Sequence, residues 1–336
     1  MAASMEAWEA WEMLTEQPDE TLSDPAKIAF CCQHLLYIKD RNGKVVPLLL
    51  NNTQLMIVKA YCEMRRQGVP VRIICLKGRQ QGSSTLCCAL VLLEMLAYGN
   101  RSTLAATEEK GGSAKNMFNK YKDFLDRFPL LPEGKDMRYL CDQVTDGHRF
   151  QLDNGSYLRT EGEKEIISYT THSVHISEAA FFTDFSTYFP PLMAGVPHFP
   201  NTTVFIESTA TQYGDGFFDH WSRAENGLSN FMAVFAAWFV HEENVMPVPD
   251  DPDAYAKFKQ SIGQMQKVYG DEIALQQQFG LSEQQLMFRR YRIDNECDGS
   301  IGEFQRQYPS TAQEAFLAAE RPVFCLLYTS PSPRDS

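Results

Sequence analysis

The 336-residue sequence has no long hydrophobic run. Its longest uninterrupted apolar stretch, Leu86–Leu93, ends at Glu94, far short of the ~18 apolar residues that a membrane-spanning helix needs. A basic leader is also missing, because residues 1–24 carry seven acidic side chains and no basic one, whereas a secretory signal begins with positive charge. The sequence therefore predicts a cytoplasmic protein that is not secreted and has no membrane partner.

Cysteine pairs with the spacing of metal ligands are absent as well. The chain has nine cysteines but no C-x-x-C, and Cys75, Cys87 and Cys88 lie within apolar stretches. Buried thiols there act as small hydrophobic side chains. The sequence therefore predicts neither a disulfide framework nor a zinc site, and it predicts a reducing compartment.

An excess of basic residues is the third absence. Lys and Arg number 31 against 43 Asp and Glu, for a net charge of −12. This balance excludes a simple basic DNA-coating protein, although not a motor whose DNA track is a local basic strip. With 44% hydrophobic and 22% charged residues, the composition is that of a globular protein with a sizeable core.

The segment after Pro70 alternates between two patterns. Aliphatic and β-branched runs typical of strands are separated by longer runs typical of helices. Strands are expected at residues 71–76, 102–106, 173–177 and 202–207, with helices at 54–64, 84–98 and 108–128. Alternating strands and helices form a mostly parallel central sheet with helices on both faces, so the predicted fold class is α/β.

Two other stretches depart from this alternation. Within residues 149–170, short strand-like runs are separated by Asn154-Gly155 and Glu161-Gly162. Because Asn-Gly is a strong hairpin signal, we predict an antiparallel hairpin insertion. Toward the C-terminus the chain is polar and helical, over 252–279 and then 281–295.

The two ends of the sequence need separate interpretations. A short amphipathic helix with Trp8 and Trp11 is expected at 5–14; packing on its own domain is favoured over binding a partner. Residues 325–336 look like one translated frame of a sequencing-library adapter, the alternative being an ordinary Ser/Pro tail. We treat them as an artefact and leave them out of the fold prediction.

A Gly/Ser-rich loop, Leu76–Thr85, lies between an apolar strand and an apolar helix. In this position, backbone N–H groups and a helix N-terminus converge on an anion. Ser83 occupies the place of the usual phosphate-loop lysine, while Ser84 keeps the hydroxyl expected to hold Mg²⁺. The phosphate charge must then be balanced by Lys77 and Arg79.

Polar residues follow two later strands. Ser177-Glu178 ends the run at 173–177, where a carboxylate faces the same crevice as the phosphate loop. Glu178 is the natural group to orient an attacking water, and Ser177 stands where an aspartate would hold Mg²⁺ through water. Ser208, Thr209 and Ala210 follow the next strand and are suited to sensing the γ-phosphate.

Together these motifs resemble, in order, the ATPase domain of the large terminase subunit, the DNA-packaging motor of tailed bacteriophages. The family's glutamine motif is matched by Gln54, whose amide is able to read an adenine edge. Its Walker A loop is matched by residues 77–85, its Walker B ending by residues 177–180 and its coupling motif by residues 208–210. The resemblance covers about residues 45–320 and includes 214–221, 238–243 and 304–316.

The resemblance implies a P-loop NTPase fold and a role for each matched residue. Glu178 and Arg79 would be catalytic, Arg79 by stabilising charge on the γ-phosphate, and Ser84 and Ser177 would order Mg²⁺, partly through water. Ser208, Thr209 and Ala210 would couple phosphate loss to movement. The nucleotide would be bound by Gln54, Lys77, Gly78, Arg79, Gln80, Gln81, Gly82, Ser83, Ser84 and Thr85.

Three features depart from the family pattern. The Walker lysine is displaced to Lys77, Ser177 replaces an aspartate, and residues 166–168 read Ile-Ile-Ser where many relatives have an Arg-Gly pair. The family's second domain, a nuclease, is expected after residue 324, so endonuclease activity is expected only of the full-length protein. The resulting division is an acidic leader and lead-in over 1–44, a P-loop ATPase domain over 45–250 and a helical subdomain or linker over 251–324.

The implied function is ATP hydrolysis that moves double-stranded DNA into a procapsid. The implied cofactors are ATP and Mg²⁺. The implied partners are the small terminase subunit, the portal protein and further copies of the chain in a ring, in the host cytoplasm and transiently at the portal. Two alternatives stay open: a helicase-like translocase, and a non-hydrolysing phage assembly protein with a degenerate nucleotide site.

Overall fold

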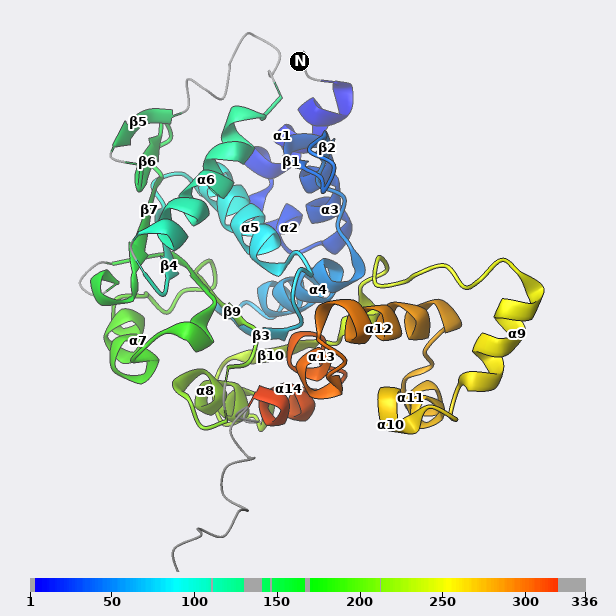
Figure 1. Cartoon of the computed structure of the whole chain (residues 1–336). Coiled ribbons are helices and arrows are strands. Elements are labelled where there is room, and N and C mark those ends of the chain that lie inside the picture. Colours follow the sequence, from blue (N-terminus) through cyan, green and yellow to red (C-terminus); the bar gives the residue numbers. More distant parts are fainter. Residues whose placement is uncertain are drawn as a thin grey trace, which may run out of the picture.

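An eight-stranded sheet forms the centre of the computed structural model (Figure 1). The structure describes residues 4–109, 111–129, 141–145, 147–166, 170–211 and 213–319. The suspected adapter segment 325–336 and two of the three residues at 166–168 therefore lie outside the described residues. None of the described helices combines the length and the apolar composition that crossing a membrane requires.

The strands of this sheet are mostly parallel. Their order across the sheet is β10 (Met232–Ala236), β3 (Val71–Lys77), β9 (Thr203–Ser208), β8 (Ser173–Ser177), β4 (Ser102–Thr107), β7 (Tyr157–Gly162), β6 (Arg149–Leu152) and β5 (Cys141–Thr145). The strands from β10 to β7 run parallel, whereas β5 and β6 are antiparallel to their neighbours. This confirms the predicted α/β class and its mostly parallel sheet.

The predicted antiparallel hairpin insertion is confirmed. β6 and β7 form an antiparallel pair around Asn154-Gly155, with Gly155 at φ +82°. The second proposed turn, Glu161-Gly162, is wrong, because β7 continues through these residues and pairs in parallel with β4. β10 was not predicted, because periodicity alone does not distinguish a strand from a helix in a short run of apolar residues. Its parallel pairing with β3 shows that it is a strand.

Helices cover both faces of the sheet (Figure 1). One face packs against α4 (Asn52–Arg66), α5 (Ser83–Tyr98) and α6 (Gly112–Asp126), and α1 (Met5–Glu16) and α3 (Pro25–Leu35) pack on these helices in the same apolar cluster. The other packs against α7 (Phe185–Ala194), α8 (Gly216–Glu225) and α14 (Ala312–Ala319). Successive residues of β3, such as Ile73 and Ile74, enter opposite cores, as strand pleating requires.

The N-terminal acidic segment is part of this core. Ala7, Ala10 and Leu14 of α1 are buried, and the helix packs on α3 and α5. The Trp11 ring meets Phe128 edge-on at 5.9 Å. The helix therefore docks on its own domain, the favoured interpretation. A short helix, α2 (Pro18–Thr21), and a two-stranded hairpin of β1 (Tyr37–Lys39) and β2 (Val45–Pro47) complete this region.

A separate group of helices follows β10. It comprises α9 (Pro252–Ser261), α10 (Gln266–Tyr269), α11 (Glu272–Phe279), α12 (Glu283–Glu296) and α13 (Ile301–Gln307). Its own apolar cluster surrounds Trp238, which stacks on Phe288 at 5.7 Å. The helix expected over 252–279 is broken where Gly263 and Gly270 adopt φ +80° and +71°, values that glycine tolerates.

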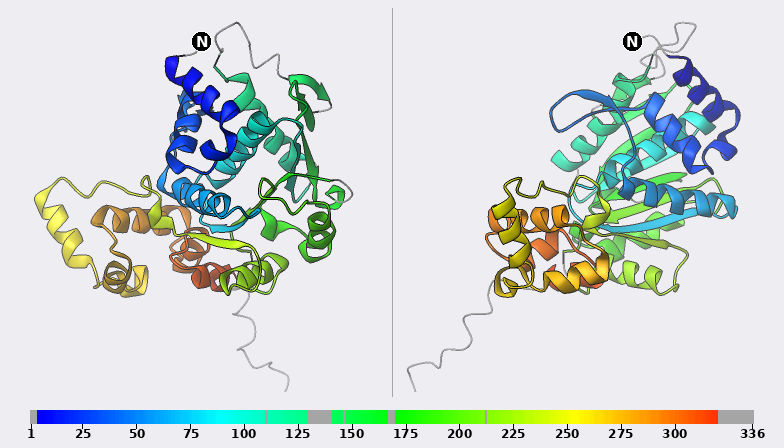
Figure 2. Two further views of the ribbon diagram at one scale, coloured as in Figure 1. Left: turned by 180° about the vertical axis from the view of Figure 1, so that it is seen from behind. Right: turned by 90° about the vertical axis from the view of Figure 1, so that its right-hand side faces the viewer.

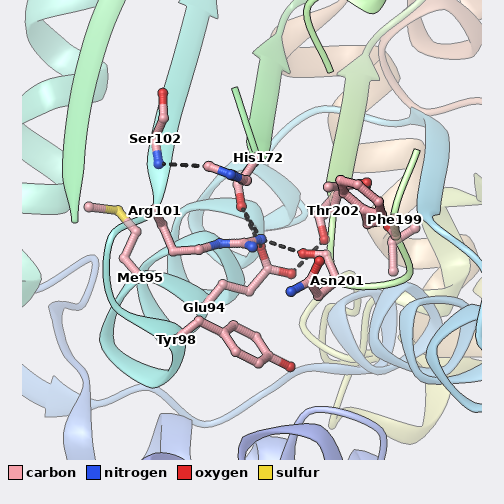
Figure 3. A network of polar contacts seen from close by, with 12 residues as sticks. Glu94, Met95, Tyr98, Arg101, Ser102, His172, Phe199, Asn201 and Thr202 are labelled. Carbon is pink, nitrogen blue, oxygen red and sulfur yellow. Dashed lines mark hydrogen bonds and ion pairs between the residues drawn. The ribbon is translucent and has the colours of Figure 1, made fainter. Parts of the chain in front are cut away.

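A buried ionic network lies near the amino ends of the central strands (Figure 3). Glu94 of α5 is fully buried and accepts hydrogen bonds from Arg65 Nη2 at 2.8 Å and Ser173 Oγ at 2.6 Å. Burial favours the neutral acid, but Arg65 and Arg101 hold the pKa of Glu94 below its ordinary value. Arg101 in turn donates to the carbonyl of Asn201. The network ties α4 and α5 to the sheet.

We expect Glu94→Gln to lower the free energy of unfolding by about 3–5 kcal/mol, because buried guanidinium groups would lose their anion. The urea midpoint, measured by circular dichroism, reports the change. Glu63→Gln is the matched control, since Glu63 pairs with Arg66 at 3.7 Å on the surface, where such a pair contributes little. Equal shifts in both variants would contradict a structural role for the buried pair.

Candidate functional site

The phosphate-loop candidate connects the end of β3 to the start of α5. Gly82 precedes α5 at φ +77°, and a Cβ there would lie 2.8 Å from Gln54 Nε2. Two features therefore favour glycine at this position: the positive φ and the lack of room for a Cβ. A cavity of about 490 Å³ adjoins the loop and is lined by Gln80, Gln81, Gly82, Ser83, Ser84 and Thr85, with Lys77, Glu178, Arg41 and Lys120.

Gln54 of α4 is hydrogen-bonded to this loop. Its Nε2 donates to Gly82 O at 3.0 Å, and its Oε1 accepts from Asn51 N at 3.0 Å in a capping box. Asn51 Nδ2 donates to Gln81 O at 3.2 Å. Gln54 is 3% exposed, so in this arrangement its amide holds the loop. Adenine recognition by Gln54 stays a prediction.

Lys77 lies between two carboxylates. Its Nζ donates to Glu178 Oε1 at 3.0 Å and forms an ion pair with Glu207 Oε2 at 2.9 Å. Burial alone would lower the pKa of the Lys77 ammonium, but Glu207 and Glu178 hold it well above its ordinary value. The ammonium therefore stays charged, and it joins the end of the loop strand to the candidate catalytic carboxylate.

Glu207 was not among the predicted site residues. It is fully buried on β9, level with Cys75 of β3 and Ser177 of β8. Burial alone would raise the pKa of its carboxyl, but Lys77 and His175 hold it well below the ordinary value. The sequence did contain a signal for Glu207. A charged residue inside a strand that is covered on both faces needs a counter-charge. Lys77, on a neighbouring strand, is a charge of opposite sign with the same need.

His175 completes a row of four ionisable groups, of which Glu178 is partly exposed and the other three are buried. Its Nε2 donates to Glu207 Oε1 at 3.2 Å, and its Nδ1 lies 3.8 Å from Cys88 Sγ. Burial disfavours the charged ring, but the hydrogen bonds to Cys88 and Glu207 raise the pKa of His175 to about 9. His175, Glu207, Lys77 and Glu178 thus alternate in charge across β8, β9 and β3.

Ser208, the last residue of β9, and Thr211 hold the loop that carries Glu178 through hydrogen bonds. Ser208 Oγ accepts from Ala180 N at 3.1 Å, and Thr211 Oγ1 lies 3.0 Å from Ala180 O. Glu178 adopts φ +54°, which costs a non-glycine residue about 1–3 kcal/mol and persists only where surrounding contacts enforce it. Thr211 also contacts Asp215, the N-cap of α8. A chain of hydrogen bonds through Thr211 therefore connects the loop that carries Glu178 to the N-cap of α8.

The structure brings most predicted site residues to one edge of the sheet. Arg79 and Thr209 line a second cavity of about 340 Å³ together with Lys77 and Glu178, and Arg79 N donates to Gln307 O at 2.9 Å. Gly78 lies outside the lining of both cavities. Ala210 is buried in the apolar cluster on the α7–α8 face.

The residues predicted to hold Mg²⁺ fit that ion by chemistry. Ser84 lies in the first turn of α5 and Ser177 at the carboxyl end of β8. Mg²⁺ prefers oxygen ligands and keeps several waters, a set to which two hydroxyl groups can contribute. Within the described ranges, no three His, Cys, Asp or Glu side chains form a metal cluster.

Phage large terminases are among the solved structures that resemble this chain. The HK97 bacteriophage large terminase is 11% identical, with a TM-score of 0.53, over 73% of this chain and 53% of that one. The Thermus phage P74-26 large terminase ATPase domain is 15% identical (TM-score 0.40; 65% and 90% covered). The large terminase of thermophilic bacteriophage D6E, solved with ADP, is 12% identical (TM-score 0.47; 78% and 53% covered).

The sequence comparisons add nothing to this likeness, since no protein-family model and no curated protein matches the chain. The match spans about half the length of the HK97 protein. At this low identity the likeness shows the fold alone. The chain accordingly has, over 73% of its length, the fold of the HK97 large terminase, the fold that the ordered motifs of its sequence predict.

Proposed function

We propose that this chain is the ATPase part of a phage large terminase subunit, and that it hydrolyses ATP to move double-stranded DNA into a procapsid. The observation that carries the proposal is the convergence of three motifs on one cavity edge. The phosphate loop, Glu178 and the Ser208–Thr211 segment come from β3, β8 and β9, and the Lys77 ion pairs and the Ala180 hydrogen bonds join them.

The proposed roles follow from position and chemistry. The loop from Gly78 to Thr85 directs the first backbone N–H groups of α5 toward phosphate oxygens, and Lys77 supplies a cation at its strand side. Glu178 orients the attacking water, and Arg79 stabilises charge that develops on the γ-phosphate. Bound Mg²⁺, ordered by Ser84 and Ser177, would supply further charge stabilisation to the phosphates.

Glu178 has to exchange partners during this cycle. With Lys77 Nζ at 3.0 Å, one of its carboxylate oxygens is engaged in an ion pair. Glu207 offers the same ammonium a second partner at 2.9 Å, so Lys77 stays neutralised when Glu178 turns to a water. Ser208 and Thr211 hold the backbone beside Glu178 and would pass its displacement to α8. On this basis we propose the coupling role for Ser208 and, because they belong to the same segment, for Thr209 and Ala210.

The larger assembly belongs to the same proposal. The partners would be double-stranded DNA, the small terminase subunit, the portal protein and further copies of this chain in a ring, at the portal in the host cytoplasm. We propose an ATPase domain over residues 45–250, with residues 251–324 as a helical linker. The apolar cluster that α9–α13 form around Trp238, separate from the two clusters on the sheet, supports a distinct helical part. Trp238 itself precedes residue 250, and α14 packs with the cluster on the α7–α8 face of the sheet.

Measurement of ATP turnover with and without double-stranded DNA tests the proposal. A packaging ATPase is expected to hydrolyse ATP, with DNA changing the rate. Binding of ATP without turnover under any condition would favour the non-hydrolysing assembly protein. Turnover with ATP-dependent strand separation of a DNA fork would favour the helicase-like translocase.

Ser208→Ala tests the hydrogen bond between Ser208 and the loop that carries Glu178. Loss of one neutral hydrogen bond, worth about 0.5–1.5 kcal/mol, is expected to slow ATP hydrolysis by up to about tenfold and to leave the Kd for ATP within twofold. Steady-state turnover and equilibrium binding report the two quantities. Ser222→Ala, on the adjoining helix α8, is the control. Unchanged turnover in Ser208→Ala would exclude the hydroxyl from coupling.

A further inference from the structure

Two basic side chains that belong to none of the motifs line the cavity beside the phosphate loop. Arg41 comes from the turn between β1 and β2, and Lys120 from α6; both face the same 490 Å³ cavity as Lys77, Glu178 and the loop. β1 packs beside α6 (Figure 2). Two neighbouring elements thus bring cations to one wall of the site.

Lys77 cannot by itself balance the charge of a phosphate chain. Its ammonium is outnumbered by the Glu178 and Glu207 carboxylates. Counting His175 as a cation only brings this group to zero. A nucleoside triphosphate carries several negative charges, which several facing cations stabilise through charge-assisted hydrogen bonds. Further charge compensation must therefore come from outside the row of four, from Arg79 and from other cations that line the site.

Arg41 is positioned to change partners. Its guanidinium pairs with Glu243 at 3.6 Å, with both side chains 62% exposed, and a surface ion pair of this kind contributes little. The turn that carries it is well held, because Asp40 Oδ1 accepts from Asn42 N at 2.9 Å and from Lys44 N at 2.8 Å. A fixed backbone with a weakly held guanidinium suits bidentate phosphate binding.

We propose that Arg41 and Lys120 bind the phosphate chain of the nucleoside triphosphate, and that Arg41 leaves Glu243 when it does so. The inference rests on the proposed ATPase function, since it adds binding residues to the same site. It gives the β1–β2 hairpin a function as a side wall of the nucleotide site, and it makes the Arg41–Glu243 pair a competitor of the nucleotide.

Equilibrium binding of Mg·ATP, Mg·ADP and AMP to the full chain tests this assignment. We expect Arg41→Ala and Lys120→Ala each to raise the Kd for ATP about tenfold, as loss of one charge-assisted contact does. The increase should be smaller for ADP and absent for AMP. Arg41→Lys should recover part of the loss. Lys44→Ala on the same hairpin and Lys115→Ala on α6 are matched controls, because neither residue lines the cavity.

Glu243→Gln supplies a readout of opposite sign. Removal of the competing carboxylate is expected to lower the Kd for ATP by up to about threefold, which a structural role of the surface pair would not do. If the wild type binds ATP and Arg41→Ala and Lys120→Ala bind it no more weakly than Lys44→Ala and Lys115→Ala, the inference is overturned and the proposed function stands. If the wild type binds no ATP, both are overturned.

Discussion

Replacement of Glu178 by Gln is expected to lower kcat for ATP hydrolysis at least about 100-fold while the Kd for ATP stays nearly unchanged. A carboxylate that orients and activates water contributes about 10²–10⁴ to a rate, and each ~1.4 kcal/mol of barrier is tenfold. Gln keeps the size of the side chain and an oxygen that can accept from Lys77 Nζ, now 3.0 Å from Glu178 Oε1. Binding geometry should thus survive the loss of charge.

Single-turnover kinetics and equilibrium nucleotide binding separate the two effects. Glu165→Gln is a matched control, since Glu165 is exposed on the short 3₁₀ turn after β7. Turnover at the wild-type rate in Glu178→Gln would remove Glu178 from the reaction. A large increase in Kd with kcat unchanged would assign it to nucleotide binding.

Lys77→Ala is the second substitution with a large expected effect. We expect it to abolish ATP turnover, while Ser83→Ala changes turnover less than about twofold, because Ser83 provides no cation at the usual lysine position. Lys77→Ala should also lower the free energy of unfolding by about 3–5 kcal/mol, since it leaves the buried Glu207 carboxylate without its ammonium partner. The reverse ranking of Lys77 and Ser83 would contradict the displaced-lysine assignment.

A double variant separates the two consequences of losing Lys77. In Lys77→Ala with Glu207→Gln, the unpaired buried charge is gone, so most of the lost unfolding free energy should return. ATP turnover should not return, because the cation at the loop is still missing. Thermal unfolding and ATP hydrolysis measured on both variants distinguish a residue that acts on phosphate from one that only balances Glu207. Recovery of turnover together with stability would leave Lys77 with a structural role alone.

The residues near the phosphate loop show which features local sequence determines. The β3–loop–α5 unit was predictable because an apolar strand, a Gly-rich turn and an apolar helix are adjacent in the chain. The order of Glu178 and Ser208 after their strands placed both at the carboxyl edge, since all strands of a parallel sheet end on the same side. The α/β class followed from the same periodicity.

The contacts inside the site depend on tertiary structure. Lys77 on β3 reaches Glu207 on the neighbouring strand β9, although β4, β5, β6, β7 and β8 lie between these two strands in the sequence. No local sequence pattern specifies this strand order. Gln54 donates a hydrogen bond to Gly82 because α4 packs beside the phosphate loop. Arg41 lines the cavity because the β1–β2 hairpin packs beside α6. The sequence by itself determined the helices, the strands and their motifs, because these depend on short-range propensity and on the periodicity of apolar residues. The packing of elements distant in the sequence decided which charged side chains form ion pairs.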